Sequence, residues 1–167
     1  MERIFFQKLR SPVGELFIYA DKDDLLALTF RQNKIQVLKQ LGIERPVNQS
    51  NPLIQLTISQ LEKYFKGELK SFQIPVRLSG TKFQLAIWNA LRKIPHGEIS
   101  NYKKQAIRLK KPQAVRAVGA ANGRNPISII IPCHRILGSN GSLTGYAGGI
   151  SAKAKLLELE GQPTFSQ

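Results

Sequence analysis

The chain of 167 residues contains a single cysteine, Cys133, and His134 and Arg135 follow it directly. The thiolate of a cysteine is a strong nucleophile, and a neighbouring cation or histidine lowers the thiol pKa from its ordinary value of about 8.5. These three residue types side by side fit a nucleophilic thiol. A lone cysteine after a run of isoleucines is, however, more often an inert buried thiol that acts as a small hydrophobic group. Both interpretations remain open on the residues alone.

A catalytic histidine needs a third group to orient it, and the second half of the chain offers few acids. The candidates are Glu98, Glu158 and Glu160, and spacing does not choose between them. Glu158 and Glu160 are typical of solvated carboxylates at the end of a helix. Adjacent residues of a strand point to opposite faces, so an interaction of Cys133 with His134 requires a bend or a bridging water.

The charge balance favours a polyanionic partner. Lys and Arg number 25 against 11 Asp and Glu, a formal net charge of +14, which suits phosphate neutralisation and counterion release. The sequence lacks the run of roughly 18 apolar residues of a membrane helix, and its first residues do not resemble a signal peptide. One cysteine and two histidines make a poor zinc site. We therefore expect an intracellular protein with no metal and no membrane partner.

The first half is typical of an α+β unit. Turn residues separate short β-like runs, and residues 33–41 are expected to be helical. A second helix is expected after Asn51, which suits a cap, with Pro52 in the first turn. Residues 71–78 then return to a strand pattern, and Gly80 is the expected domain boundary. The three β-like runs are 3–9, 15–20 and 24–30, and the apolar face of the second helix is Ile54, Ile58, Leu61 and Phe65.

The second half is mostly helical. A helix is expected from Thr81, and a short one capped by Ser100 should run to about Leu109. Residues 113–123 predict a further helix, so this basic region is a candidate helix-turn-helix. Its small residues would allow a close approach to a duplex or, equally, close packing on the neighbouring helix. The apolar residues on one face of the helix from Thr81 are Phe83, Ala86, Ile87, Ala90, Leu91 and Ile94. The small residues of the helix over 113–123 are Ala114, Ala117, Gly119, Ala120 and Ala121.

The cysteine lies between two segments of contrasting character. Residues 127–131 predict a buried strand that Pro132 interrupts. Residues 138–149 form a glycine-rich loop whose backbone can approach a ligand closely. A last helix over 151–160 is expected, capped by Ser151 and ended by a glycine.

Three segments closely resemble the O6-alkylguanine-DNA alkyltransferases, also called methylated-DNA–protein-cysteine methyltransferases. They are "GTKFQLAIWNALRKIPHGEISNYKKQA", "AVRAVGAANGRNPISIIIPCHRIL" and "GSLTGYAGGISAKAKLLELEG", in order from Gly80 to Gly161. The resemblance implies an α+β fold with two domains. Residues 1–79 would be a ribonuclease-H-like α/β scaffold, and residues 80–167 a mostly helical DNA-binding and alkyl-transfer domain with a helix-turn-helix.

The resemblance also implies a mechanism. Cys133 would accept the alkyl group of O6-alkylguanine in a single-turnover displacement, with O4-alkylthymine as a further candidate substrate. His134 would generate the thiolate through a water, held by Glu160. Tyr102 would help to rotate the damaged nucleotide out of the duplex and protonate the departing base, and Arg116 would fill the gap. No cofactor is implied.

Further residues match the pocket and the DNA surface of the family. Asn125 would brace the turn near the cysteine, and the backbones of Cys133, Ile136 and Ala147 would contact the guanine. DNA contact in the minor groove is implied for the small residues Ala114, Ala117, Gly119 and Ala121. The partner would be double-stranded DNA containing O6-alkylguanine. The protein would act in the cytoplasm, or in the nucleus of a eukaryote, as a monomer, with association along DNA left open.

Two features restrict what the resemblance implies, and two other functions remain open. Some relatives bind zinc through cysteine and histidine in the first domain, but no cysteine is present there. Others carry tryptophan in place of Cys133 and only bind damaged DNA.

A Cys–His hydrolase would turn over repeatedly on an ester or peptide and needs an oxyanion hole. A lesion sensor would bind damaged DNA without any transfer.

Overall fold

The computed structural model describes residues 2–163, and its N-terminal half contains a four-stranded sheet in the order β3-β2-β1-β4. β1 (Phe5–Ser11), β2 (Gly14–Ala20) and β3 (Leu25–Phe30) form the predicted antiparallel meander. The short strand β4 (Val47–Asn48) pairs parallel with β1 and was not predicted.

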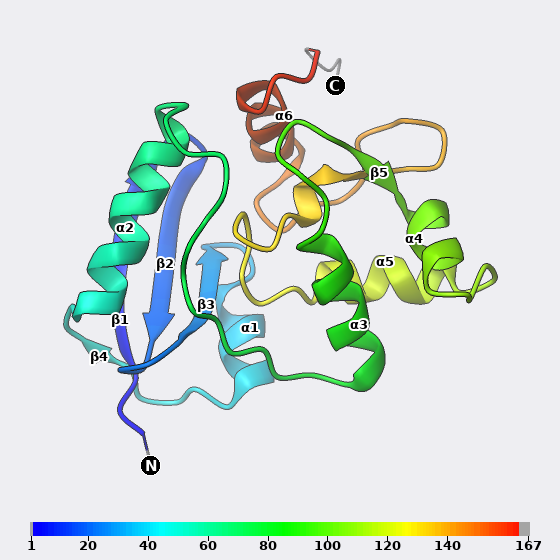
Figure 1. Ribbon diagram of the computed structural model, residues 1–167. Coiled ribbons are helices and arrows are strands. Elements are labelled where there is room, and N and C mark those ends of the chain that lie inside the picture. Colours follow the sequence, from blue (N-terminus) through cyan, green and yellow to red (C-terminus); the bar gives the residue numbers. More distant parts are fainter. Residues whose placement is uncertain (1, 164–167) are drawn as a thin grey trace.

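Two helices cover the two faces of this sheet (Figure 1). α1 (Lys34–Leu41) and α2 (Pro52–Phe65) agree with the predicted helices. The Asn51 side chain accepts a hydrogen bond from the Ile54 amide at 2.8 Å, as expected of a cap. Successive strand residues point to opposite faces, so β2 contributes to two clusters. Leu16, Ile18 and Ala20 pack in the cluster that contains α2, and Phe17 and Tyr19 in the cluster that contains α1.

The predicted strand over 71–78 is wrong. Only Val76 pairs with the sheet, through an isolated bridge to Leu25. Pro75 supplies its carbonyl to the Leu25 amide at 2.8 Å but has no N–H of its own to extend the ladder. The segment is therefore an extended connection along the sheet edge.

The C-terminal half begins with α3 (Lys82–Leu91), which a capping box of Thr81 and Gln84 opens. The predicted apolar stripe is largely confirmed, but Ala86 is exposed, and Trp88, which the stripe omitted, is fully buried. The Trp88 indole N–H donates to the carbonyl of Ala121 on a later helix at 2.9 Å, which fixes the two helices together.

The helix-turn-helix consists of α4 (Tyr102–Arg108) and α5 (Val115–Gly123). Its predicted cap is wrong by one residue: Asn101, not Ser100, accepts from the Lys104 amide at 2.8 Å. Ser100 instead belongs to β5 (Ser100–Asn101), which pairs parallel with β6 (Ile136–Leu137) directly after the cysteine segment. This small sheet was not predicted.

The predicted strand over 127–131 is also wrong. Ile127 makes only an isolated bridge to Leu28 of β3, and Ile129 has a φ of 72°. A β-branched residue rarely adopts this left-handed region, and here it reverses the chain, as the 3.0 Å hydrogen bond from the Ile131 amide to the Ile127 carbonyl shows. Ile127, Ile129 and Ile131 are buried as expected and Ile130 is half-buried, but these residues form a turn, called here the isoleucine turn, that is hydrogen-bonded to the N-terminal sheet.

The last helix, α6 (Ile150–Leu159), begins after Gly149, and no side chain caps it, so the predicted Ser151 cap is wrong. Gly161 ends the helix with a φ of 93°, as expected of the residue after a helix. Among residues 2–163, none of the helices has the length and hydrophobicity that a membrane span requires.

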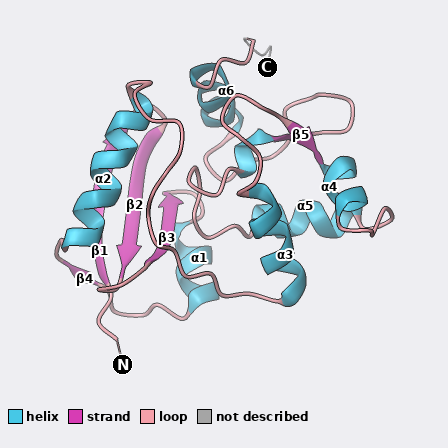
Figure 2. Cartoon of the chain, in the orientation of Figure 1, coloured by secondary structure: helices cyan, strands magenta, loops and turns pink. Residues whose placement is uncertain are grey.

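One hydrophobic cluster joins the two halves of the protein. It contains residues of β2, β3 and α2 together with Trp88, Val118 and Leu156 from three C-terminal helices. Figure 2 shows the larger sheet on one side and the C-terminal helices and long loops on the other. The N-terminal sheet is thus continuous in packing with the segment that carries the cysteine.

Candidate active site

Cys133 begins a single 3₁₀ turn, η1 (Cys133–Arg135), directly after the buried isoleucine turn. Its side chain is 8% exposed. Burial raises the pKa of the thiol, although a hydrogen bond from the Asn125 side chain and the charge of Lys153 act in the opposite direction. The resting thiol is therefore protonated, contrary to the expectation of a lowered pKa, and requires a base before it can act as a nucleophile.

His134 is the base nearest in the chain, and it is fully buried. Its Nε2 lies 2.8 Å from Oε2 of Glu160, so Nε2 carries the proton and donates to the carboxylate. Nδ1 is buried and has no hydrogen-bond partner among the described residues. Burial lowers the pKa of His134 despite the nearby Glu160. The imidazole is thus neutral at pH 7, with Nδ1 as the nitrogen that can take a proton.

Glu160 lies at the C-terminal cap of α6 and is 5% exposed. Arg135 donates to it twice, from Nε to Oε1 at 2.8 Å and from Nη2 to Oε2 at 3.0 Å. The hydroxyl of Tyr64 donates to Oε2 at 2.6 Å. Burial would raise the pKa of Glu160, but the hydrogen bonds from His134 and Arg135 outweigh burial and hold the pKa well below its usual range.

The two other candidate acids are excluded as partners of His134. Glu98 and Glu158 are exposed, whereas Glu160 contacts the imidazole. The interpretation of Glu160 as a solvated helix-end carboxylate is therefore wrong, and the acid that the resemblance implied is the one that the structure brings to His134.

Asn125 holds the turn that precedes the cysteine. Its Nδ2 donates to the Ile131 carbonyl at 2.8 Å, and its Oδ1 accepts from the Ile127 amide at 3.0 Å. The sheet edge provides the other support, because the Leu28 amide donates to the Pro126 carbonyl at 3.0 Å. Both ends of the isoleucine turn are thereby fixed by hydrogen bonds.

A narrow cleft of about 50 Å³ opens beside Cys133 between α5 and the glycine-rich loop. Tyr102 and Ala147 line it, whereas Ile136, for which a backbone contact is expected, does not, and its side chain is fully buried. The Tyr102 hydroxyl is hydrogen-bonded to Oγ1 of Thr144 in the loop, at 2.9 Å. Pockets for whole organic ligands run to several hundred Å³, so this cleft is smaller than a typical ligand pocket.

The surface of α5 carries some of the predicted DNA contacts but not all. Arg116 and Ala117 are exposed, Ala114 is half-buried at the start of the helix, and Gly119 lines the cleft beside Tyr102. Ala121 is 4% exposed and packs in the core, so its side chain is not on this surface and its prediction as a DNA contact is wrong.

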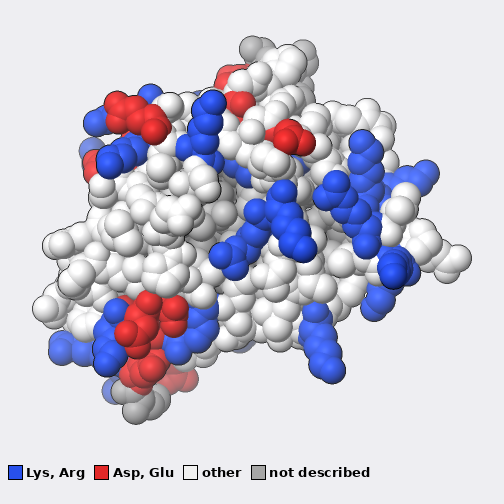
Figure 3. Space-filling model, viewed as in Figure 1, with Lys and Arg blue, Asp and Glu red and all other residues white. Residues whose placement is uncertain are grey.

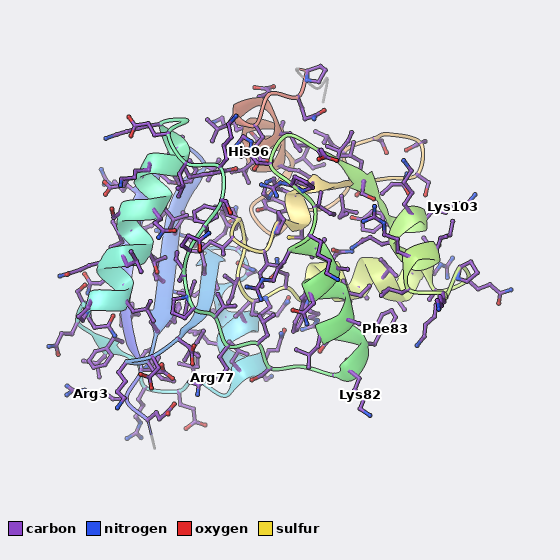
Figure 4. All side chains as sticks on the ribbon, in the orientation of Figure 1. Arg3, Arg77, Lys82, Phe83, His96 and Lys103 are labelled. Atoms are coloured by element: carbon purple, nitrogen blue, oxygen red, sulfur yellow. The ribbon has the colours of Figure 1, made fainter. Side chains whose placement is uncertain are left out.

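The basic side chains of the C-terminal half have few acidic residues to balance them. On the face in Figure 3, basic side chains spread over the region of α3 and α4, while the acidic side chains form patches at the upper left, at the lower left and near the top. Lys103 projects outward from α4 (Figure 4). All the basic side chains between residues 92 and 124 are exposed, and none of them forms an ion pair with a described residue. They are Arg92, Lys93, Lys103, Lys104, Arg108, Lys110, Lys111, Arg116 and Arg124.

Sequence reasoning missed two residues of this site, Lys153 and Tyr64. Lys153 is 1% exposed on α6, and burial lowers its pKa to about 8, while the thiol of Cys133 acts in the opposite direction. The position of Lys153 among the apolar residues of this helix could have indicated a buried lysine. Tyr64 had no signal, because it contacts Glu160 across 96 positions of the chain. Among residues 2–163, no group of three His, Cys, Asp or Glu side chains could hold a metal ion.

Comparison with known families identifies both halves. Residues 82–162 match the DNA-binding domain of 6-O-methylguanine DNA methyltransferase, and residues 4–78 match its ribonuclease-like domain. The methylated-DNA–protein-cysteine methyltransferase of Methanosarcina acetivorans is 42% identical over 158 residues, which cover 95% of this chain and 99% of that protein. The Haemophilus influenzae protein of the same name is 43% identical, with 98% and 89% covered.

Solved structures agree with this assignment. A crystal structure of Mycobacterium tuberculosis O6-methylguanine methyltransferase superposes with a TM-score of 0.81 at 40% identity and covers 94% of this chain and 92% of its own. A crystal structure of M. tuberculosis OGT in complex with DNA also has a TM-score of 0.81 at 40% identity, with 93% and 92% covered.

Proposed function

Because this chain belongs to the 6-O-methylguanine DNA methyltransferase family, we propose that it repairs DNA by transferring the alkyl group of O6-alkylguanine to its own Cys133. The observation that carries the proposal is the arrangement of a buried thiol, a neutral histidine and an ionised Glu160 beside a cleft. The substrate is double-stranded DNA, for which the basic surface around α4 and α5 supplies charge.

The chemistry requires three changes at named atoms. His134 takes the thiol proton at Nδ1 through a water, and the thiolate of Cys133 attacks the alkyl carbon in line with the bond to guanine O6. The carbon–sulfur bond forms as the carbon–oxygen bond breaks, and the electron pair passes to the guanine, which receives a proton from Tyr102. The thioether has no route back to a thiol, so each molecule acts once, and no cofactor takes part.

The proposal also assigns roles to the residues of the pocket. Asn125 braces the turn that carries the cysteine, as its two hydrogen bonds support. The backbones of Cys133, Ile136 and Ala147 contact the guanine. Tyr102 is well placed for its role because it lines the cleft next to Gly119 of α5.

The substrate base must leave the duplex to reach this cleft. Extrusion of a base costs a few kcal/mol and less for a damaged base. Arg116 inserts into the duplex where the nucleotide was, and Ala114, Ala117 and Gly119 allow α5 to approach the minor groove closely. The exposure of Arg116 and Ala117 supports this arrangement.

The organisation of the chain belongs to the proposal. Residues 1–79 form a scaffold domain and residues 80–167 the transfer domain, which the two family matches support. The protein acts as a monomer in the cytoplasm, or in the nucleus of a eukaryote, where its substrate is found.

The direct test is intact and peptide mass spectrometry after incubation with an oligonucleotide that carries one O6-methylguanine. The expected result is one methyl group on the Cys133 peptide and an equal amount of restored guanine. Repeated release of product from an ester or peptide would indicate the hydrolase instead. Tight binding to the lesion without any methyl gain would indicate the sensor.

Replacing Arg116 with alanine should slow methyl transfer in duplex DNA by about 10- to 100-fold, because the flipped state loses the side chain that fills the gap. The loss corresponds to about 1–3 kcal/mol. Transfer from the free base O6-methylguanine should be unchanged, since no base has to be extruded. The rates on both substrates, with Arg108→Ala as a matched exposed control on α4, check this expectation; equal losses on both substrates would contradict it.

A further inference from the structure

The His134–Glu160 relay, which would take up the proton of Cys133 in the proposed reaction, has a contact in the N-terminal half of the chain. Tyr64 is on α2 and is 1% exposed. Its hydroxyl donates to Oε2 of Glu160 at 2.6 Å, and the same oxygen accepts from Nε2 of His134 at 2.8 Å. The phenol and the imidazole therefore share one carboxylate oxygen.

The ring of Tyr64 is held firmly from several sides. It makes edge contacts with Phe65 at 5.3 Å and with His96 at 6.1 Å between ring centroids, and a tilted contact with Phe72 at 5.3 Å. His96, labelled in Figure 4, follows α3 and thus belongs to the C-terminal half. The hydroxyl cannot swing away from Glu160 without displacing these neighbours.

We propose that Tyr64 is a positioning residue for alkyl transfer: its hydroxyl fixes the Glu160 carboxylate and limits how strongly that carboxylate holds the proton of His134. The inference rests on the proposed function and extends it, because it gives the N-terminal half a part in the chemistry besides support. Each hydrogen bond that a carboxylate accepts withdraws electron density from its oxygens, so a second donor weakens the bond to the first.

The direction of the effect follows from the charges around His134. Glu160 favours the imidazolium, whereas Arg135 and Lys153 disfavour it. Burial and the adjacent Glu160 raise the pKa of Tyr64, so the phenol remains a proton donor at any working pH. Without the phenol, Oε2 of Glu160 accepts hydrogen bonds only from His134 and Arg135. The imidazolium then becomes more stable, and His134 should titrate at a higher pH.

Tyr146 and Cys133 are the other titratable groups near this relay, and neither changes the direction. The ring of Tyr146 lies 6.4 Å from that of His134, and burial raises the pKa of its phenol well above the ordinary value. The thiol of Cys133 is also neutral at rest. Burial lowers the pKa of His96, and its ring forms no hydrogen bond with Glu160.

The test compares Tyr64→Phe with Tyr19→Phe, which removes a buried phenol from the cluster on the opposite face of the sheet. NMR follows the histidine ring signals against pH without DNA, and since the chain has two histidines, His96→Gln assigns them. In parallel, single-turnover methyl transfer is measured from pH 5 to pH 9. For Tyr64→Phe, the His134 titration and the acid limb of the rate profile should both move upward by about 0.5–1 pH unit.

A purely structural role would lower the rate at every pH without moving the limb or the titration, and that result would overturn the inference. If Tyr64→Phe does not fold, site-specific 3,5-difluorotyrosine at position 64 provides a stronger donor and should move both curves downward; unmoved curves again overturn it. Absence of transfer in the unmodified protein would refute the proposed function, whereas the titration would still decide the role of Tyr64.

Discussion

Cys133→Ala will transfer no methyl group and yet will bind the lesion. The thiol is the acceptor in the proposed reaction, and alanine has no nucleophilic atom, so the methyl gain in the mass spectrum should disappear completely. The fold should survive, because the residue is a small buried side chain and loss of its sulfur removes little volume, at about 1 kcal/mol. Affinity for an oligonucleotide with O6-methylguanine should stay within about threefold, since backbone groups and the basic surface supply the contacts.

Cys133→Ser is the matched variant for the chemistry. It keeps the size of the side chain and the hydrogen-bonding partners, but a hydroxyl is much harder to ionise than a thiol, so transfer should fall below detection here as well. Retained transfer in either variant would place the acceptor elsewhere in the chain. Failure of the unmodified protein to gain a methyl group, with both variants still bound to the lesion, would return Cys133 to the role of a core residue.

The first half of the fold follows largely from local pattern. The meander and the capped α2 were predictable because alternation, turn residues and Asn51 all act within a few positions. Residues 127–131 were not, because a run of β-branched residues ordinarily predicts a strand. Here the pairing of Ile127 with Leu28 and the two hydrogen bonds of Asn125 impose a turn with Ile129 at a φ of 72°. Tertiary contacts override the local preference at the point where the cysteine must be presented.

The site was predictable only in part for a similar reason. The neighbours of Cys133 in the sequence could be named at once, but the partner of His134 lies 26 positions away and that of Glu160 on α2 lies 96 away. No periodicity reports such contacts. The resemblance selected Glu160 correctly, because it carries information on which residues a fold brings together. The pattern of small residues could not separate Ala121 from the DNA surface, because the side of α5 that faces Trp88 is buried and also contains small residues.

Glu160→Ala should destabilise the protein more than any other single change to the site. The variant leaves three buried donors without an acceptor, on Tyr64, His134 and Arg135. Removal of one partner from a buried ion pair costs about 3–5 kcal/mol. In a chain of this size, that corresponds to a fall in Tm of about 6–20 °C. Thermal and urea unfolding at pH 7 measure it, with Glu158→Ala as the control, an exposed acid on the same helix that should change stability by less than about 0.5 kcal/mol.

The pH dependence of stability supplies an independent check on Glu160. Its pKa in the folded protein is held below the ordinary carboxyl value, because the hydrogen bonds from His134 and Arg135 outweigh burial. A lowered folded pKa means that the unfolded chain binds the proton more readily, so the stabilisation is complete above the unfolded pKa of about 4.3 and is lost as the pH falls below it. The difference in unfolding free energy between the unmodified protein and Glu160→Gln should therefore shrink from pH 6 to pH 3. A difference that stays constant over this range would show that the carboxylate charge does not stabilise the folded protein.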